Sequence, residues 1–100
     1  MTAQVQEART KPITAVRRLF GYHIPDPYAT PDEAETRRQN IENTRQMLAD
    51  IQEHRGVRLE WQGCTEDAWG ERKKLFRKRP GILKLEEELR GGDIVLFGFF

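Results

Sequence analysis

The longest periodic segment of the chain, residues 31–54, predicts a helix. Apolar or weakly polar side chains recur along it at spacings of three, four or seven residues, which places them on one helix face. Thr30 can cap the first turn, Pro31 suits the first helical position, and Gly56 follows the last turn. The stripe consists of Ala34, Ile41, Thr44, Met47, Leu48 and Ile51. We expect it to pack on the rest of the domain, and a coiled-coil contact with a partner or a second copy is the alternative.

Two other segments carry the patterns of strands. In residues 57–62, Val57, Leu59 and Trp61 alternate with polar side chains, which is the period of a half-buried strand. Residues 93–99 contain a short and nearly continuous apolar run. We expect the two segments to pair with each other, because pairing would bury one face of the apolar run.

Shorter helices are predicted in the rest of the chain. Residues 13–20 place apolar side chains on one side, and Gly21 is positioned to end that helix. Residues 65–79 form a second candidate that ends before Pro80, and residues 82–90 form a third. The predicted fold is therefore α+β and α-dominated, with one long helix, two to three shorter helices and a minor two-stranded β element.

Composition indicates a single small domain, residues 1–100, with a lean core. Hydrophobic residues make up 37% of the 100 residues and charged residues 33%, so the isolated domain would be marginally stable. We expect residues 1–12 and 21–30 to be extended peripheral segments, because the first is largely polar and the second contains Pro25 and Pro27. A small domain of this kind gains stability from a partner, which favours an interaction protein.

Six of the eleven residues from 71 to 81 are basic, although the net charge of the whole chain is only +1. They are Arg72, Lys73, Lys74, Arg77, Lys78 and Arg79. On a helix most of them lie opposite Trp69 and Phe76, so we interpret them as a basic helix face with these two aromatic side chains in the core. Such a face can bind nucleic-acid phosphates, an acidic protein or, peripherally, anionic lipid. The alternative is a solvated face whose positive charge is balanced by the three glutamates at residues 86–88.

Two segments are candidates for docking on a partner. A proline-rich strap, residues 22–28, holds aromatic side chains on an extended backbone, and an apolar tail, residues 94–100, ends in two phenylalanines. A domain of this size cannot easily cover both faces of such a tail. The predicted docking residues are Tyr22, Ile24, Tyr28, Leu96, Phe97, Phe99 and Phe100.

Patterns for catalysis and metal binding are weak. Cys64 is the single cysteine, and nothing in the sequence orients the imidazole of His54 toward its thiol. One cysteine and two separated histidines do not make a structural zinc site, and no phosphate-binding glycine motif is present. We expect a protein that is not an enzyme and has no cofactor, no metal and no small-molecule substrate.

A single cysteine excludes an intramolecular disulfide, which suits a reducing compartment. The N-terminus lacks the apolar core of a signal peptide, and no apolar run is long enough for a transmembrane segment. We expect an intracellular, cytoplasmic protein, with the matrix side of the mitochondrion as the alternative.

The favoured function is a non-catalytic accessory subunit or adaptor. It would dock on a larger protein or ribonucleoprotein assembly, or on a second copy, through the tail and the strap, while the basic face contacts phosphate or an acidic surface. The alternative is a small nucleic-acid-binding regulator of phage or plasmid type, dimeric through the stripe of residues 34–51.

Overall fold

The computed structural model describes residues 11–98. Its elements are β1 (Ala15–His23), α2 (Pro31–His54), β2 (Val57–Glu66), the short 3-10 helices η1 (Trp69–Lys73) and η2 (Phe76–Lys78), α3 (Pro80–Glu88) and β3 (Ile94–Gly98). The predictions made for residues 1–10 and for Phe99 and Phe100 lie outside the described residues. No helix within residues 11–98 is both long and apolar enough to cross a bilayer.

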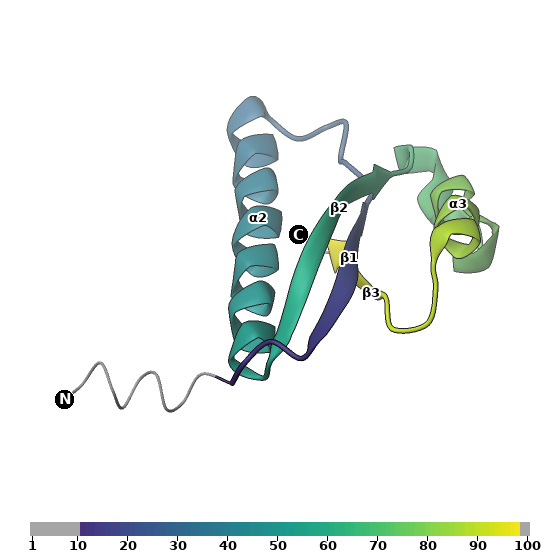
Figure 1. Ribbon diagram of the computed structural model, residues 1–100. Coiled ribbons are helices and arrows are strands. Elements are labelled where there is room, and N and C mark those ends of the chain that lie inside the picture. The colour runs from purple at the N-terminus through teal and green to yellow at the C-terminus, as the bar shows by residue number, and fades with distance from the viewer. Residues whose placement is uncertain (1–10, 99–100) are drawn as a thin grey trace.

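The three strands form one parallel sheet in the order β2-β1-β3. Parallel neighbours require crossover connections: α2 makes the first, and η1, η2 and α3 make the second. The two crossovers lead to opposite sides of β1, and Figure 1 shows α2 on one face of the sheet and α3 on the other. This is a small doubly wound α/β arrangement with β1 at its centre.

The predicted α+β, α-dominated fold class is wrong. The sheet is parallel and has three strands, not two. Residues 57–62 lie in β2 and residues 94–98 form β3, but the two strands do not pair with each other because β1 lies between them. The error follows from β1, whose sequence was predicted to be a helix.

Residues 13–20 do not form the predicted short helix, because most of them belong to β1. The second half of β1 buries four consecutive residues, Leu19 to Tyr22, as expected for a central strand covered on both faces. A run buried on both faces has no period of two, so its pattern resembles that of a short helix. Residues 21–23 are consequently part of the sheet and not of an extended peripheral segment.

The predicted helix over residues 65–79 is also wrong. The strand β2 continues to Glu66, and the chain then makes two separate 3-10 helices. Lys74 and Leu75 between them have extended backbone angles, with ψ of 154° and 138°, which no continuous helix allows. The third predicted helix is confirmed with shifted ends, as α3 begins at Pro80.

The helix predicted over residues 31–54 is confirmed as α2. The Thr30 side chain accepts a hydrogen bond from the backbone N–H of Glu33 at 3.2 Å, and Pro31 occupies the first turn. This cap satisfies a donor that the first turn would otherwise leave free. The local signals at this end of α2 therefore determine where it begins.

The better packed side of the sheet is the one that faces α3. Phe20 and Tyr22 of β1 pack there on Ile82 and Leu85 of α3, and all four side chains are buried. The hydroxyl of Tyr22 donates to the buried carboxylate of Asp67 at 2.8 Å. Both oxygens of that carboxylate accept from the N–H of Gly81, at 2.9 and 3.0 Å, so Asp67 joins β1 to the start of α3.

The side of the sheet that faces α2 is packed less tightly. Leu19 is buried, but α2 itself contains no fully buried side chain. Trp61 of β2 lies under the guanidinium of Arg45, 5.4 Å from the ring centroid. Farther along the predicted stripe, Met47 and Ile51 remain 59% and 43% exposed.

Candidate binding surface at the carboxyl edge of the sheet

Parallel strands bring their carboxyl ends to one edge of the sheet, and in doubly wound folds ligands bind outside that edge. At this edge β1 ends at His23 and β2 ends at Glu66. The strap leaves β1 there and leads to α2, while the chain after β2 leads to η1 and η2 (Figure 1). We name residues 69–79, which contain both 3-10 helices, the basic turns.

The strap is held in place by its own side chains. The carboxylate of Asp26 accepts from the backbone N–H of Tyr28 at 2.8 Å and forms an ion pair with Arg37 of α2 at 3.3 Å. Pro25 and Pro27 on either side of Asp26 restrict the backbone further. These contacts present the ring of Tyr28, 81% exposed, edge-to-face with Trp69 at a centroid distance of 6.4 Å.

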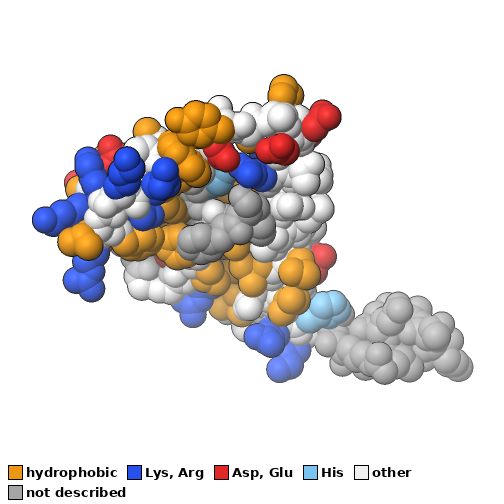
Figure 2. Space-filling view, turned by 180° about the vertical axis from the view of Figure 1, so that it is seen from behind, with side chains coloured by type: hydrophobic (Ala, Val, Ile, Leu, Met, Phe, Trp, Pro, Cys, Tyr) orange, Lys and Arg blue, Asp and Glu red, His pale blue; other side chains and the backbone are white. Residues whose placement is uncertain are grey.

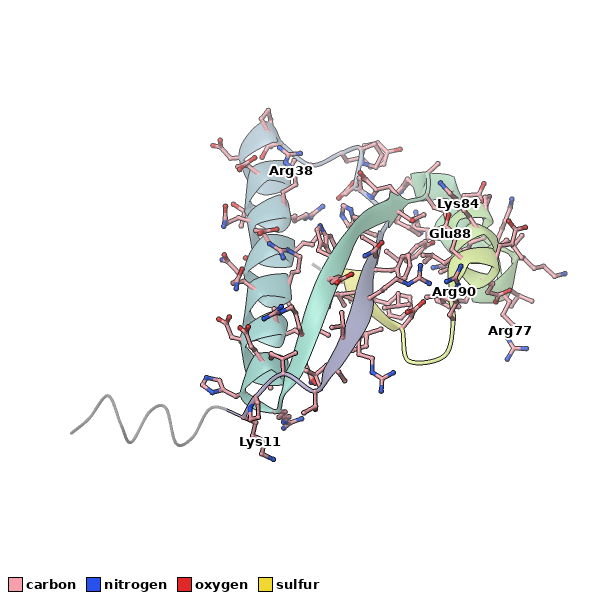
Figure 3. All side chains as sticks on the ribbon, in the orientation of Figure 1. Lys11, Arg38, Arg77, Lys84, Glu88 and Arg90 are labelled. Atoms are coloured by element: carbon pink, nitrogen blue, oxygen red, sulfur yellow. The ribbon has the colours of Figure 1, made fainter. Side chains whose placement is uncertain are left out.

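Three cations of the basic turns point into solvent. Lys73, Arg77 and Lys78 are exposed, and their side chains make no hydrogen bond or ion pair with any residue in the range 11–98. Figure 3 shows the side chain of Arg77 directed away from the sheet. Lys74 differs, because its ammonium pairs with Glu71 at 2.8 Å.

Two arginines of the basic turns, Arg72 and Arg79, lie over aromatic rings. The guanidinium of Arg72 is 4.3 Å from the ring centroid of Trp69, and that of Arg79 is 5.5 Å from the centroid of Phe76. Arg79 also donates to the backbone carbonyl of Arg72 at 3.1 Å, which joins the two turns. Seen from behind, Lys and Arg side chains gather on the side of α3 and the turns, with hydrophobic side chains between them (Figure 2).

The prediction of a basic helix face is therefore corrected to a basic surface on turns. Trp69 and Phe76 do not lie opposite the cations, and Phe76 is 43% exposed. Each aromatic ring stands three residues before its arginine, a spacing that a 3-10 helix brings onto one side. That spacing is visible in the sequence, but it becomes informative only when the segment is known to be 3-10 and not α-helical.

A second feature of the carboxyl edge is a hollow of about 260 Å³ between the strand ends and α2. His23, Cys64, Glu66 and Ile41 line it, and the Nδ1 of His23 lies 3.6 Å from the Oε2 of Glu66. Nothing in the sequence oriented His54 toward Cys64, and His54 lies at the other end of α2 from the hollow. Only the parallel register brings Cys64 and His23 to the same hollow.

The hollow is poorly suited to catalysis or to binding anions. Partial desolvation and the negative charge of Glu66 raise the pKa of the Cys64 thiol, a direction that disfavours the thiolate although the residue is exposed. The two arginines that line the hollow are paired with carboxylates, Arg37 with Asp26 and Arg38 with Glu35. Within residues 11–98 no group of three or more metal-ligating side chains is positioned to hold an ion. The basic turns are the stronger candidate site.

The structure separates the predicted docking residues into different environments. Tyr22 is buried in the core, so it is not an anchor for a partner. Ile24 and Phe97 pack against the same core, and Leu96 is half-buried in β3. Of the docking residues that the structure describes, Tyr28 is the one that presents an exposed aromatic ring.

Comparison with protein-family models, with curated proteins and with solved structures found no match to this chain.

Proposed function

We propose that this protein binds the phosphate backbone of a nucleic acid through the basic turns, as a non-catalytic regulator or accessory module. The observation that carries the proposal is the state of Lys73, Arg77 and Lys78. All three are exposed, and no carboxylate within residues 11–98 neutralises them. When such cations bind the phosphates of a nucleic acid, they displace the counterions condensed on it, and the release of those counterions favours binding.

The simplest alternative is a solvated basic surface without a ligand, balanced by nearby glutamates. The glutamates of residues 86–88 were expected to balance the basic segment. They are exposed on α3, and among the residues described they make no ion pair with the basic turns. The arginine-covered rings of Trp69 and Phe76 add flat surfaces between the cations, a combination typical of nucleic-acid-binding grooves.

The test compares two triple variants of equal charge. K73A/R77A/K78A removes the exposed cations of the basic turns, whereas K11A/R55A/R58A removes three cations near the amino edge of the sheet, where Figure 3 shows Lys11. Binding to labelled single-stranded and duplex oligonucleotides is measured by fluorescence anisotropy at several salt concentrations. For the first variant we expect the slope of log K against log salt to become shallower by roughly 2 to 3, and the affinity near 0.1 M salt to fall about a hundredfold.

The control variant should retain most of the wild-type affinity and slope. Equal losses in both triple variants would show that only total charge matters, and an absence of binding by the wild type would reject the proposal. Anionic lipid vesicles form a third arm of the assay. Binding to vesicles without binding to either oligonucleotide would assign the basic turns to a membrane surface.

A second candidate function, an accessory subunit that docks on a protein partner or a second copy, is favoured by α2. Met47 and Ile51 are one helical turn apart, so their exposed side chains form one continuous apolar spot. This part of α2 lies away from the basic turns, so the two functions are compatible. The corresponding prediction is given in the Discussion.

A further inference from the structure

We infer that Tyr28 is a stacking platform for an unpaired base, so that the ligand of this surface is single-stranded nucleic acid. The inference rests on the proposed function and adds the class of nucleic acid. Its starting point is the position of Tyr28, an exposed aromatic side chain at the carboxyl edge, in contact with the first of the basic turns.

The ring of Tyr28 is accessible to a flat ligand. Its side chain is 81% exposed, and its contact with Trp69 is edge-to-face, at an interplanar angle of 84°, and not a stacked pair. A base stacked on an aromatic side chain contributes about 1–3 kcal/mol by alanine substitution. In a duplex both faces of an interior base are covered by its neighbours, so only an unpaired base can use this platform.

The backbone at Tyr28 is held by contacts within the protein. The Asp26 carboxylate accepts a hydrogen bond from the backbone N–H of Tyr28, and its ion pair with Arg37 joins the strap to α2. Tyrosine has few rotatable bonds, and an ordered strap loses little conformational entropy on binding. A large exposed ring on an ordered segment is a feature that core packing does not explain.

The platform is continuous with the cations. Tyr28 contacts Trp69, whose ring lies under the guanidinium of Arg72, and Lys73 follows directly in the chain. A strand whose base stacks on Tyr28 would therefore have its next phosphates close to the basic turns. Proteins that bind single strands without a sequence preference combine aromatic side chains, on which the bases stack, with cations that follow the nucleic-acid backbone.

The experiment uses the full chain with Tyr28→Ala and, as a matched control, Tyr28→Phe, which keeps the ring. Each protein is titrated with a 12-mer single strand as DNA and as RNA, with the corresponding DNA duplex, and with an abasic strand that has phosphates but no bases. We expect tighter binding to the single strands than to the duplex. Tyr28→Ala should weaken single-strand binding by about tenfold and leave duplex binding, abasic binding and the salt slope unchanged, while Tyr28→Phe should stay within about twofold of wild type.

The inference is overturned if the duplex binds as tightly as the single strands, or if Tyr28→Ala leaves single-strand binding unchanged. It is also overturned if Tyr28→Ala weakens abasic and natural strands equally, because the loss would then not concern a base. Capture of a partner protein by wild type but not by Tyr28→Ala, with no binding to nucleic acid, would assign Tyr28 to a protein interface. If binding to nucleic acid depends on salt but is unchanged by Tyr28→Ala, only this inference is rejected. If the protein does not bind nucleic acid at all, the proposed function is rejected as well.

Discussion

Gly21 shows how a single residue sets the packing on the α2 side of the sheet. A β-carbon at this position would stand 2.6 Å from the Cη2 of Trp61 and 3.2 Å from the Sγ of Cys64. The sequence suggested that Gly21 ends a helix, but it lies within β1, beside the bulge that shifts the register of β2. Gly63, at φ +97°, supplies the left-handed residue at that bulge. The two glycines allow Trp61 and Cys64 to occupy the same face of the sheet.

The variant Gly21→Ala should lower the free energy of unfolding by about 1–3 kcal/mol, because the added methyl displaces the indole of Trp61. Urea denaturation followed by circular dichroism measures the change. Gly91→Ala is the matched control, since a β-carbon there meets nothing within 4 Å and the backbone is not left-handed. An equal effect of the two substitutions would contradict this account of Gly21.

At the scale of elements, one ion pair joins β1 to the connection between α3 and β3. Arg18 holds Asp93 with two hydrogen bonds, from Nη2 to Oδ2 at 2.5 Å and from Nε to Oδ1 at 3.1 Å. Its Nη2 also donates to the backbone carbonyl of Glu88 at 2.9 Å. The Asp93 side chain is only 7% exposed, and the hydrogen bond from Arg18, assisted by the N–H of Arg90, lowers its pKa below the ordinary value.

A lowered pKa of Asp93 in the folded state means that the unfolded chain binds the proton more readily. The stabilisation is therefore present above the unfolded pKa of about 4 and is lost as the pH falls through the folded pKa. We expect Asp93→Asn to lower the urea midpoint at pH 7 and to reduce the loss of stability between pH 5 and pH 2. Glu87→Gln, at an exposed position on α3, is the control and should preserve the wild-type pH profile.

Elements whose signals are local were predictable, and those whose pattern depends on neighbours were not. The start of α2 depends on Thr30 and Pro31, which act within one turn of the chain. The strand β1 depends on being covered from both sides, by α2 and by α3, so its apolar run carried no period that distinguishes a strand from a helix. The helix predicted over residues 65–79 was wrong for a similar reason. The path of this segment depends on a contact between residues distant in sequence, since the carboxylate of Asp67 accepts a hydrogen bond from the N–H of Gly81 at the start of α3.

At the scale of the whole molecule, the two faces of the sheet are packed unequally. The α3 side contains the cluster of Phe20, Tyr22, Ile82 and Leu85, whereas α2 contributes no fully buried side chain to the other side. A contiguous apolar spot that a small domain leaves exposed is a candidate docking site for a partner. Met47 and Ile51 are the residues left most accessible on the predicted stripe of α2.

For the second candidate function we predict that M47Q/I51Q abolishes association with a partner or a second copy. The apolar spot loses its hydrophobic contribution, about 1.5–3 kcal/mol for each side chain that the interface would bury fully. Light scattering over a range of concentrations reports a second copy, and co-purification after expression of the tagged full chain reports a partner. Leu83→Gln on α3, at a similarly exposed position, is the control. A wild-type protein that stays monomeric and co-purifies with nothing would count against docking through α2.

The sequence by itself determined α2 and its cap, the strand character of residues 57–62 and 94–98, and the excess of cations over residues 71–81. These features depend on neighbours within a few positions of the chain. Tertiary structure alone decided that β1 is the central strand and that the cations lie on 3-10 turns. It also brought Tyr28 and Trp69 together. The physical reason is that a parallel sheet joins segments separated by a whole crossover, so the carboxyl edge exists only once all three strands have paired.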